Sequence, residues 1–222
     1  MTQHGARLVF ENAKALVQNA GFNVNQAVLS QSYLRSEVAM STSTTQYTVP
    51  ILVNSAGQGG AVSYPTNNLL QLQDAFVVSE LGIFVAAPTT ATTTAFPYYT
   101  YPNAQVFSTS GAAAALYNLY NGSMSITVNN RQIMPSYDLY RHLNVPQTQE
   151  ATSTGTNTAL DQNDGSSFGY YPIEPNVVLV GSKNNQVTLN LPAAIGTLQA
   201  GTAPRIIVIF RGILAQNVTP VR

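Results

Sequence analysis

The sequence predicts a mainly β protein, a β-sandwich or jelly roll with a short helical N-terminal arm. Short runs of alternating or β-branched apolar residues recur along the chain between Gly, Pro and Asn turns, which is typical of such folds. The one convincing helical periodicity lies near the N-terminus. At 222 residues without a cysteine, the chain is long enough to be held by an apolar core rather than by disulfides.

Residues 1–34 are expected to form the helical arm. Within residues 6–20, apolar side chains that include Val9 and Leu16 fall on one face of a helix. A second short helix is predicted for residues 25–34, with an asparagine as its N-cap. Such an arm can pack on its own sheet or on a neighbouring subunit, and the sequence leaves both arrangements open.

Residues 35–222 are expected to form the sandwich domain. Strands are predicted for residues 46–53, 74–85, 123–128, 131–135, 176–180, 186–191 and 205–214. Helical turns are predicted for residues 69–72 and 116–120, and polar loops for residues 88–95 and 150–169. The 74–85 segment is expected to be one long strand or two short ones that break near Gly82. The turn at residues 183–185 is expected to join its flanking strands as a hairpin.

The central hairpin carries the clearest strand pattern. Met124, Ile126 and Val128 alternate with hydroxyl side chains, and this period of two places the apolar set on one face of a sheet. Asn129 and Asn130 tolerate the positive φ that a two-residue hairpin loop requires. The segment is therefore predicted to fold into a β-hairpin, and it carries no catalytic group.

Charge is sparse in this chain. Nine Lys and Arg residues stand against nine Asp and Glu residues, so that 8% of the residues are charged, where about 25% is ordinary. A net charge near zero favours association. Much of the neutral surface is therefore predicted to be covered by copies of the same chain, as in a homo-oligomer, or by partners. The alternative is the solvated, Thr- and Asn-rich surface of an extracellular β-domain.

The same composition limits the partners. A net charge of zero without a basic arm argues against direct contact with nucleic acid. The longest apolar runs, such as residues 206–210, are too short to span a bilayer, so no membrane span is expected. No signal peptide is recognised in the first ten residues, unless the chain begins after one. The absence of cysteine excludes thiol catalysis, Cys-ligated zinc and iron–sulfur clusters.

No catalytic, cofactor-binding or metal-binding residue is predicted. Ser136, Asp138 and His142 lie close in sequence, but a catalytic triad needs a specific geometry and an oxyanion hole, so an enzyme is the weakest hypothesis. Residues 161–165 cluster carboxylate and amide oxygens, but their spacing differs from that of an EF-hand, and a plain turn is preferred to a calcium site. The glycines at residues 57–60 lack the Lys-Ser/Thr of a phosphate loop.

Residues 96–107 are predicted to form an extended aromatic segment along the surface. Its rings could form a sugar-stacking platform or anchor an interface, because a tyrosine ring can be buried in a contact while its hydroxyl stays in water. The absence of tryptophan favours interface or core packing. The interface candidates of the whole chain are Val9, Leu16, Tyr98, Tyr99, Tyr101 and Phe107.

Four short segments carry a resemblance to a known class of proteins. They are TYPN at residues 100–103, LYNG at 119–122, VPQTQ at 145–149 and RIIVIFRGI at 205–213. Together with the neutral, Thr-, Asn- and Gln-rich composition, they make the chain resemble a bacteriophage virion structural protein, a capsid or capsid-associated subunit of the jelly-roll type. The chain lacks the long charged spine helix of the tailed-phage coat fold, which favours the jelly roll.

The resemblance implies a subunit that builds or decorates a shell and has no active site. It would be present in the virion in many copies, with copies of itself and other virion proteins as partners. The alternative is an extracellular carbohydrate-binding β-sandwich domain, in which Tyr98, Tyr99 and Tyr101 stack on sugars.

Overall fold

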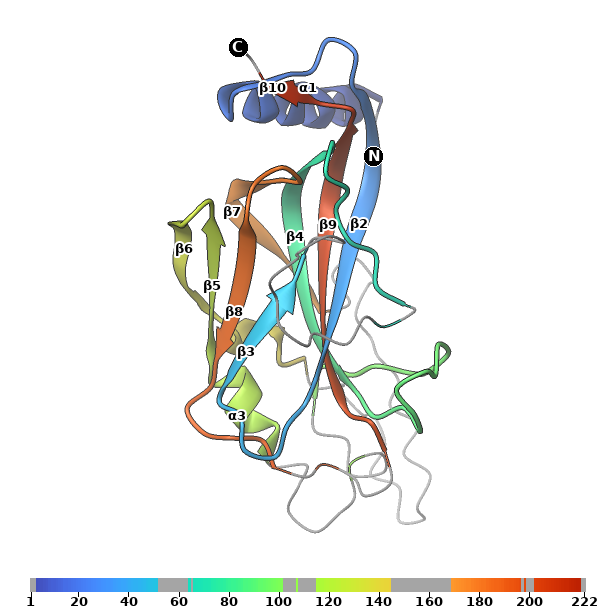
Figure 1. Cartoon of the computed structure of the whole chain (residues 1–222), viewed down its shortest axis with the longest axis vertical. Helices are drawn as coiled ribbons and strands as arrows, with labels where there is room; N and C mark the ends of the chain where they lie inside the picture. The colour runs from blue at the N-terminus through green and yellow to red at the C-terminus, as the bar shows by residue number, and fades with distance from the viewer. Residues whose placement is uncertain are drawn as a thin grey trace.

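Two antiparallel four-stranded sheets pack face to face as a β-sandwich in the computed structural model, with a helix across one end (Figure 1). The structure describes residues 3–51, 64, 66–101, 107, 115–144, 169–196, 198 and 202–220. The prediction of a mainly β sandwich with an N-terminal helix is confirmed. The features predicted at residues 57–60 and 161–165, and most of the 150–169 loop, lie outside the described residues.

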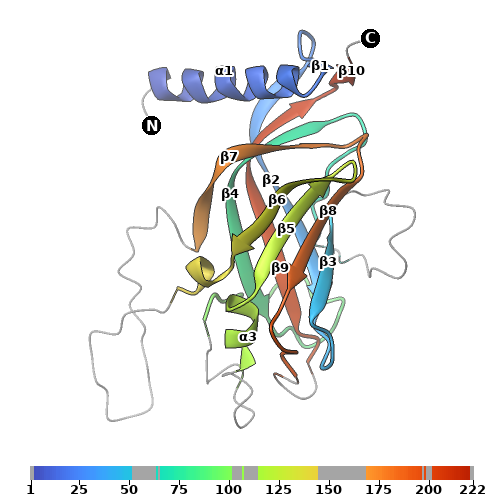
Figure 2. The same ribbon diagram turned by 90° about the vertical axis from the view of Figure 1, so that its left-hand side faces the viewer.

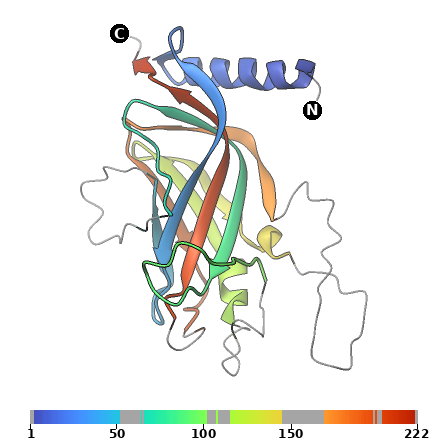
Figure 3. The same ribbon diagram turned by 90° about the vertical axis from the view of Figure 1, so that its right-hand side faces the viewer.

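Within the described residues, eight strands of five or more residues divide equally between the two sheets. Sheet I has the order β2 (Val28–Ala39), β9 (Arg205–Gln216), β4 (Ala75–Ala86) and β7 (Tyr170–Val180). Sheet II has the order β3 (Gln46–Pro50), β8 (Asn185–Asn190), β5 (Ser123–Val128) and β6 (Arg131–Asp138). The other elements of the described part of the chain are α1 (Gln3–Asn19), α3 (Tyr117–Tyr120), the 3-10 helix η1 (Tyr140–His142), and a ribbon of β1 (Phe22–Asn23) with β10 (Thr219–Pro220). Figure 2 looks onto sheet II and Figure 3 onto sheet I.

The strand pairs are nested within one another along the chain. Strand β5 pairs with β6, β4 with β7, β3 with β8, and β2 with β9, and all of these pairs are antiparallel. Successive pairs alternate between the two sheets. The chain therefore runs as one long hairpin that is rolled into a sandwich, with the β5–β6 turn at its tip.

The predicted central hairpin is confirmed. Met124 and Ile126 are fully buried, and Asn129 and Asn130 have φ values of 52° and 62°, as a two-residue loop between twisted strands requires. Strand β6 continues beyond Pro135 to Asp138, with irregular register against β5. The helical turn predicted before the hairpin is also present, as α3.

The main core lies between the sheets. Ile206, Val208 and Phe210 of β9 belong to the same buried cluster as Met124 and Ile126 of β5. Alternate residues of each strand point inward, which is the period of two that strands impose. Burying one such large apolar side chain contributes about 1.5–3 kcal/mol to stability.

Helix α1 packs on its own domain. Ala13 and Val17 are buried against sheet I, in a cluster that includes Phe22 and Val218 beside the β1–β10 ribbon. Gly21 ends the helix with a φ of 89°. Of the two arrangements that the sequence left open, the structure therefore has the arm on its own sheet. Within the described residues, no helix has the length and apolarity that crossing a membrane requires.

The second helix predicted for residues 25–34 is wrong. Residues 28–39 form β2, which pairs with β9 along its whole length. Leu34 points into the core, while Tyr33 and Arg35 point outward, so the segment follows the period of two. The pairing partner lies at the other end of the chain, and this long-range pairing overrides the local helical preference. The boundary expected between residues 34 and 35 falls inside this strand.

Two turns also differ from the prediction. Strands β7 and β8 lie in different sheets, so residues 183–185 carry the chain from one sheet to the other and do not close a hairpin. Residues 69–72 are not a helical turn, since the Leu70 amide donates to the Ile51 carbonyl in an extended arrangement. Strand β4 runs unbroken through Gly82, and its irregularity lies between Val78 and Glu80.

Candidate functional site

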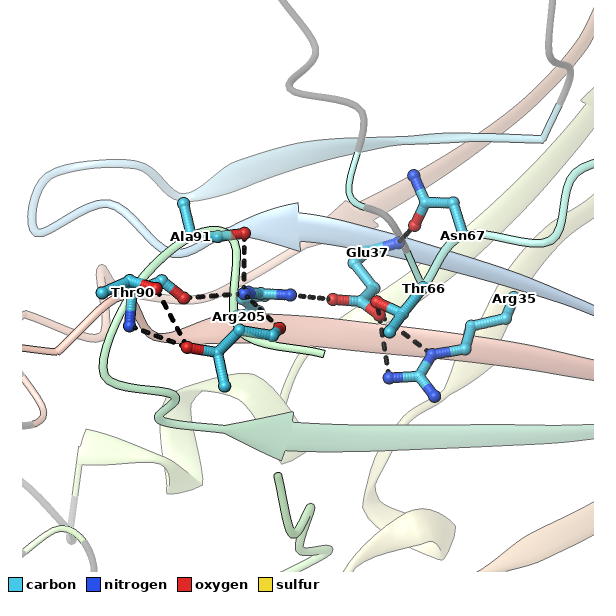
Figure 4. Close-up of polar contacts among 8 residues, drawn as sticks. Arg35, Glu37, Thr66, Asn67, Thr90, Ala91 and Arg205 are labelled. Atoms are coloured by element: carbon cyan, nitrogen blue, oxygen red, sulfur yellow. Dashed lines mark hydrogen bonds and ion pairs between the residues drawn. The ribbon is translucent and has the colours of Figure 1, made fainter. Parts of the chain in front are cut away.

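Charged side chains gather on the outer face of sheet I. Arg35 and Glu37 belong to β2, and Arg205 begins β9. Figure 4 shows these three side chains pointing toward one another. In a chain with only nine cationic and nine anionic residues, this concentration makes the cluster a candidate site.

Glu37 is held by both of its neighbouring arginines. Its Oε2 lies 2.6 Å from Nη1 of Arg205, and neither side chain is exposed. Its Oε1 accepts hydrogen bonds from Arg35 Nε at 2.9 Å and from the Thr66 hydroxyl. The backbone amide of Glu37 donates to Asn67 Oδ1 at 3.1 Å. The buried carboxylate is therefore well supplied with donors, which offsets its desolvation.

The guanidinium of Arg205 also holds the loop of residues 88–95. Its Nη2 donates to the carbonyl oxygens of Thr90 at 2.9 Å, Ala91 at 3.0 Å and Thr93 at 3.3 Å (Figure 4). The Arg205 Cζ lies 4.9 Å from the centre of the Phe96 ring. One buried cation thus ties a neutral surface loop to the sheet. The cluster therefore anchors the loop to the sheet.

The predicted interface residues have different surroundings. Val9 is exposed and Leu16 is half-buried on the helix. Phe107 is fully buried in the main core, so its assignment as an interface residue is wrong and it acts in core packing instead. The prediction placed it on the surface because it belongs to a segment that is rich in tyrosine and proline.

The three tyrosines of the aromatic segment do not form one platform. Tyr99 pairs with Val85 of β4 through two backbone hydrogen bonds of 2.8 Å and packs against the main core. Tyr101 lies beside Tyr99, with ring centres 5.9 Å apart. Tyr98 is on the outer face of sheet I, against Phe84 at 4.9 Å. Because Tyr98 and Tyr99 point to opposite sides, the three-ring stacking surface of the carbohydrate hypothesis is not formed.

Asp138 and His142 are not joined as catalytic partners. Asp138 Oδ1 accepts a hydrogen bond from the backbone amide of Tyr140 at 2.9 Å. His142 is fully buried, and its Nδ1 lies 3.2 Å from the Gly169 carbonyl oxygen. Burial lowers the pKa of the His142 imidazole to about 4, so it is neutral at neutral pH. Ser136 is exposed on β6. In the described part of the chain, no three His, Cys, Asp or Glu side chains come together as metal ligands.

Sequence reasoning missed a groove of about 740 Å³ on the outer face of sheet I. We call it the outer groove. The residues that line it include Gln31, Tyr33, Glu80, Tyr98, Tyr170 and Arg211. The assignment of residues 25–34 as a helix concealed this site. A strand period of two would have placed Gln31, Tyr33 and Arg35 on one face.

The sequence comparisons assign no family. No protein-family model matches the chain, and no curated protein matches its sequence.

Proposed function

We propose that the chain is a structural subunit of a virus particle, a bacteriophage capsid or capsid-associated protein. It assembles through contacts with its own copies and with other virion proteins, without catalysis and without direct contact with nucleic acid. The observation that carries the proposal is the nested order of the eight strands. We infer from this order a jelly roll, the double-sheet fold of many viral capsid proteins, and also of lectins and cupins.

A fold alone does not select a function. Among these classes of protein, the neutral surface favours a shell protein. Residues 38–73 and 81–130 contain no Lys, Arg, Asp or Glu. Like charges on neighbouring copies repel one another, and a surface with few charges avoids this repulsion. The neutral 88–95 loop, tied down by Arg205, offers one such surface.

The edge strands of the two sheets favour contacts between subunits through loops and sheet faces rather than through added strands. Edge strand β3 contains Pro50, β6 contains Pro135, and β7 contains Pro172 and Pro175, and a proline cannot donate to a further strand. The edge of β2 is bridged in part by Asn68. Such edges oppose open-ended strand addition, whereas a closed shell requires defined contacts.

The test is the mass of the purified chain by light scattering, at low and high salt, together with negative-stain microscopy. We expect closed rings, trimers or shells, and salt should weaken them little because few ion pairs would hold them. A 23.7 kDa monomer at every concentration and salt would contradict assembly through self-contacts.

A further inference from the structure

The outer groove is the uncovered middle of sheet I. Helix α1 crosses one end of this sheet, and residues 87–101 cross the other end (Figure 3). Val9 of α1 and Tyr98 of the crossing segment both line the groove, and its floor is formed by strand residues that include Tyr33 and Arg211. Its volume of about 740 Å³ is ample for a small ligand, since such pockets usually measure about 300–1,000 Å³.

Two aromatic rings of the groove, those of Tyr98 and Tyr170, are held in place by their neighbours. Phe84 packs edge-on against Tyr98 at 4.9 Å and against Tyr170 at 5.4 Å. The Arg211 Cζ lies 3.4 Å from the centre of the Tyr170 ring. Gly82 leaves room for these rings, because a Cβ there would lie 2.5 Å from Phe84 and 2.8 Å from Tyr170. Rings fixed in this way lose little freedom when a ligand binds.

Two of the exposed rings present surface to the groove. Tyr33 is 49% exposed and Tyr98 is 41% exposed, and both line the groove. Each tyrosine offers an apolar ring and a hydroxyl that can donate or accept. This combination suits a ligand that has both apolar C–H faces and hydroxyl groups.

The lining of the groove contains two arginines, Arg35 and Arg211, and one carboxylate, Glu80. Arg211 Nη1 lies 4.0 Å from Glu80 Oε2, and the two side chains are 46% and 41% exposed. This loose pair leaves a donor and an acceptor side by side and accessible. Arg35 is already paired with the buried Glu37. The Arg35 side chain is only 17% exposed, so the accessible charged groups of the groove are the Arg211–Glu80 pair. A ligand with several hydroxyl groups can bind both members of this pair without carrying a charge of its own.

We propose that the outer groove binds a neutral saccharide. The C–H face of a sugar ring stacks on Tyr33 or Tyr98. One ring hydroxyl donates to the Glu80 carboxylate, and a neighbouring hydroxyl accepts from the Arg211 guanidinium. The site differs from the Tyr98, Tyr99 and Tyr101 platform expected from the sequence, and it does not depend on the proposed shell function.

The experiment titrates the full chain with maltotriose, cellotriose, chitotriose and mannotriose, by calorimetry and by saturation-transfer NMR. We expect one-to-one binding of at least one trisaccharide, with little change on adding salt because the ligand is neutral. Tyr33→Ala and Tyr98→Ala should each weaken that binding about tenfold. Tyr33→Phe and Tyr98→Phe keep the ring and should retain most of it. Glu80→Gln, which removes the acceptor charge, should also weaken it.

Two exposed tyrosines outside the groove serve as matched controls. Tyr117 and Tyr140 are 43% and 53% exposed, and neither lines the groove. Tyr117→Ala and Tyr140→Ala should leave saccharide binding unchanged. The proposal is overturned if no trisaccharide binds, or if binding is the same in Tyr33→Ala, Tyr98→Ala and the controls. It is also overturned if the groove variants instead dissociate an oligomer without altering saccharide binding, because the groove would then be a contact between copies. The light-scattering test of the shell function is separate, so either proposal can fail alone.

Discussion

The guanidinium of Arg205 and the carboxylate of Glu37 lie 2.6 Å apart with neither side chain exposed, and they join β9 to β2 beside the 88–95 loop. A buried ion pair contributes little by itself, because desolvation of both ions offsets their attraction. Here the pair gains from the loop carbonyls that accept hydrogen bonds from Arg205. Its role is therefore to fix the loop relative to the sheet.

Glu37→Gln is expected to lower the free energy of unfolding by about 3–5 kcal/mol, because it leaves the buried Arg205 cation without its counter-ion. Urea denaturation of the wild type and of Glu37→Gln measures this difference. Glu80→Gln is the control, since Glu80 is exposed and lies 4.0 Å from Arg211. That change should cost less than about 1 kcal/mol. Equal losses in the two variants would contradict the anchoring role.

The elements that the sequence predicted correctly depend on local patterns. The β5–β6 hairpin has alternating Met124 and Ile126 and the turn Asn129-Asn130 within a few residues. Helix α1 has its apolar stripe within one segment. For such elements, the residues that decide the structure are neighbours in sequence, so periodicity is sufficient.

The features that could not be predicted from the sequence depend on contacts between residues that are far apart along the chain. Strand β2 exists because β9 pairs with it, and Arg205 meets Glu37 across 168 positions of the chain. The outer groove is assembled from several strands, α1 and the segment that carries Tyr98. Because residues 25–34 were predicted to be a helix, the groove could not be predicted.

His142 is expected to make stability depend on pH. Burial lowers its pKa to about 4, while the unfolded chain keeps the ordinary value of 6.5. Between these values the unfolded state binds more protons, so this contribution to stability is complete above pH 6.5 and is lost as the pH falls toward 4. The total loss is roughly 3 kcal/mol.

The measurement compares the wild type with His142→Phe by urea denaturation across this pH range. Carboxylates titrate in both chains, so the difference between the two curves isolates the histidine. The wild type should lose stability relative to the variant as the pH falls. Parallel curves would contradict the assignment of the pH dependence to His142.

Gly212→Ala is expected to destabilise the fold by about 3 kcal/mol. A Cβ at Gly212 would lie 1.9 Å from the Val77 carbonyl oxygen, so the backbone at the β4 irregularity would have to move. Gly196→Ala is the comparison, because a Cβ at Gly196 meets no atom within 4 Å. Its φ of +76° leaves only a conformational cost of about 1–2 kcal/mol. Thermal and urea unfolding should rank the two variants in this order, and the reverse order would contradict the close approach.

The neighbouring residues Tyr98 and Tyr99 are expected to respond differently to truncation. Tyr99→Ala removes a ring that packs against the main core and lies 5.9 Å from Phe107, so it should cost about 2 kcal/mol or more. Tyr98→Ala removes an exposed ring that touches Phe84 from outside, and it should cost less than about 1 kcal/mol. Urea denaturation of both variants measures the difference. If Tyr98→Ala were the more destabilising change, Tyr98 would be a structural residue, and a loss of saccharide binding in that variant could not be assigned to the groove.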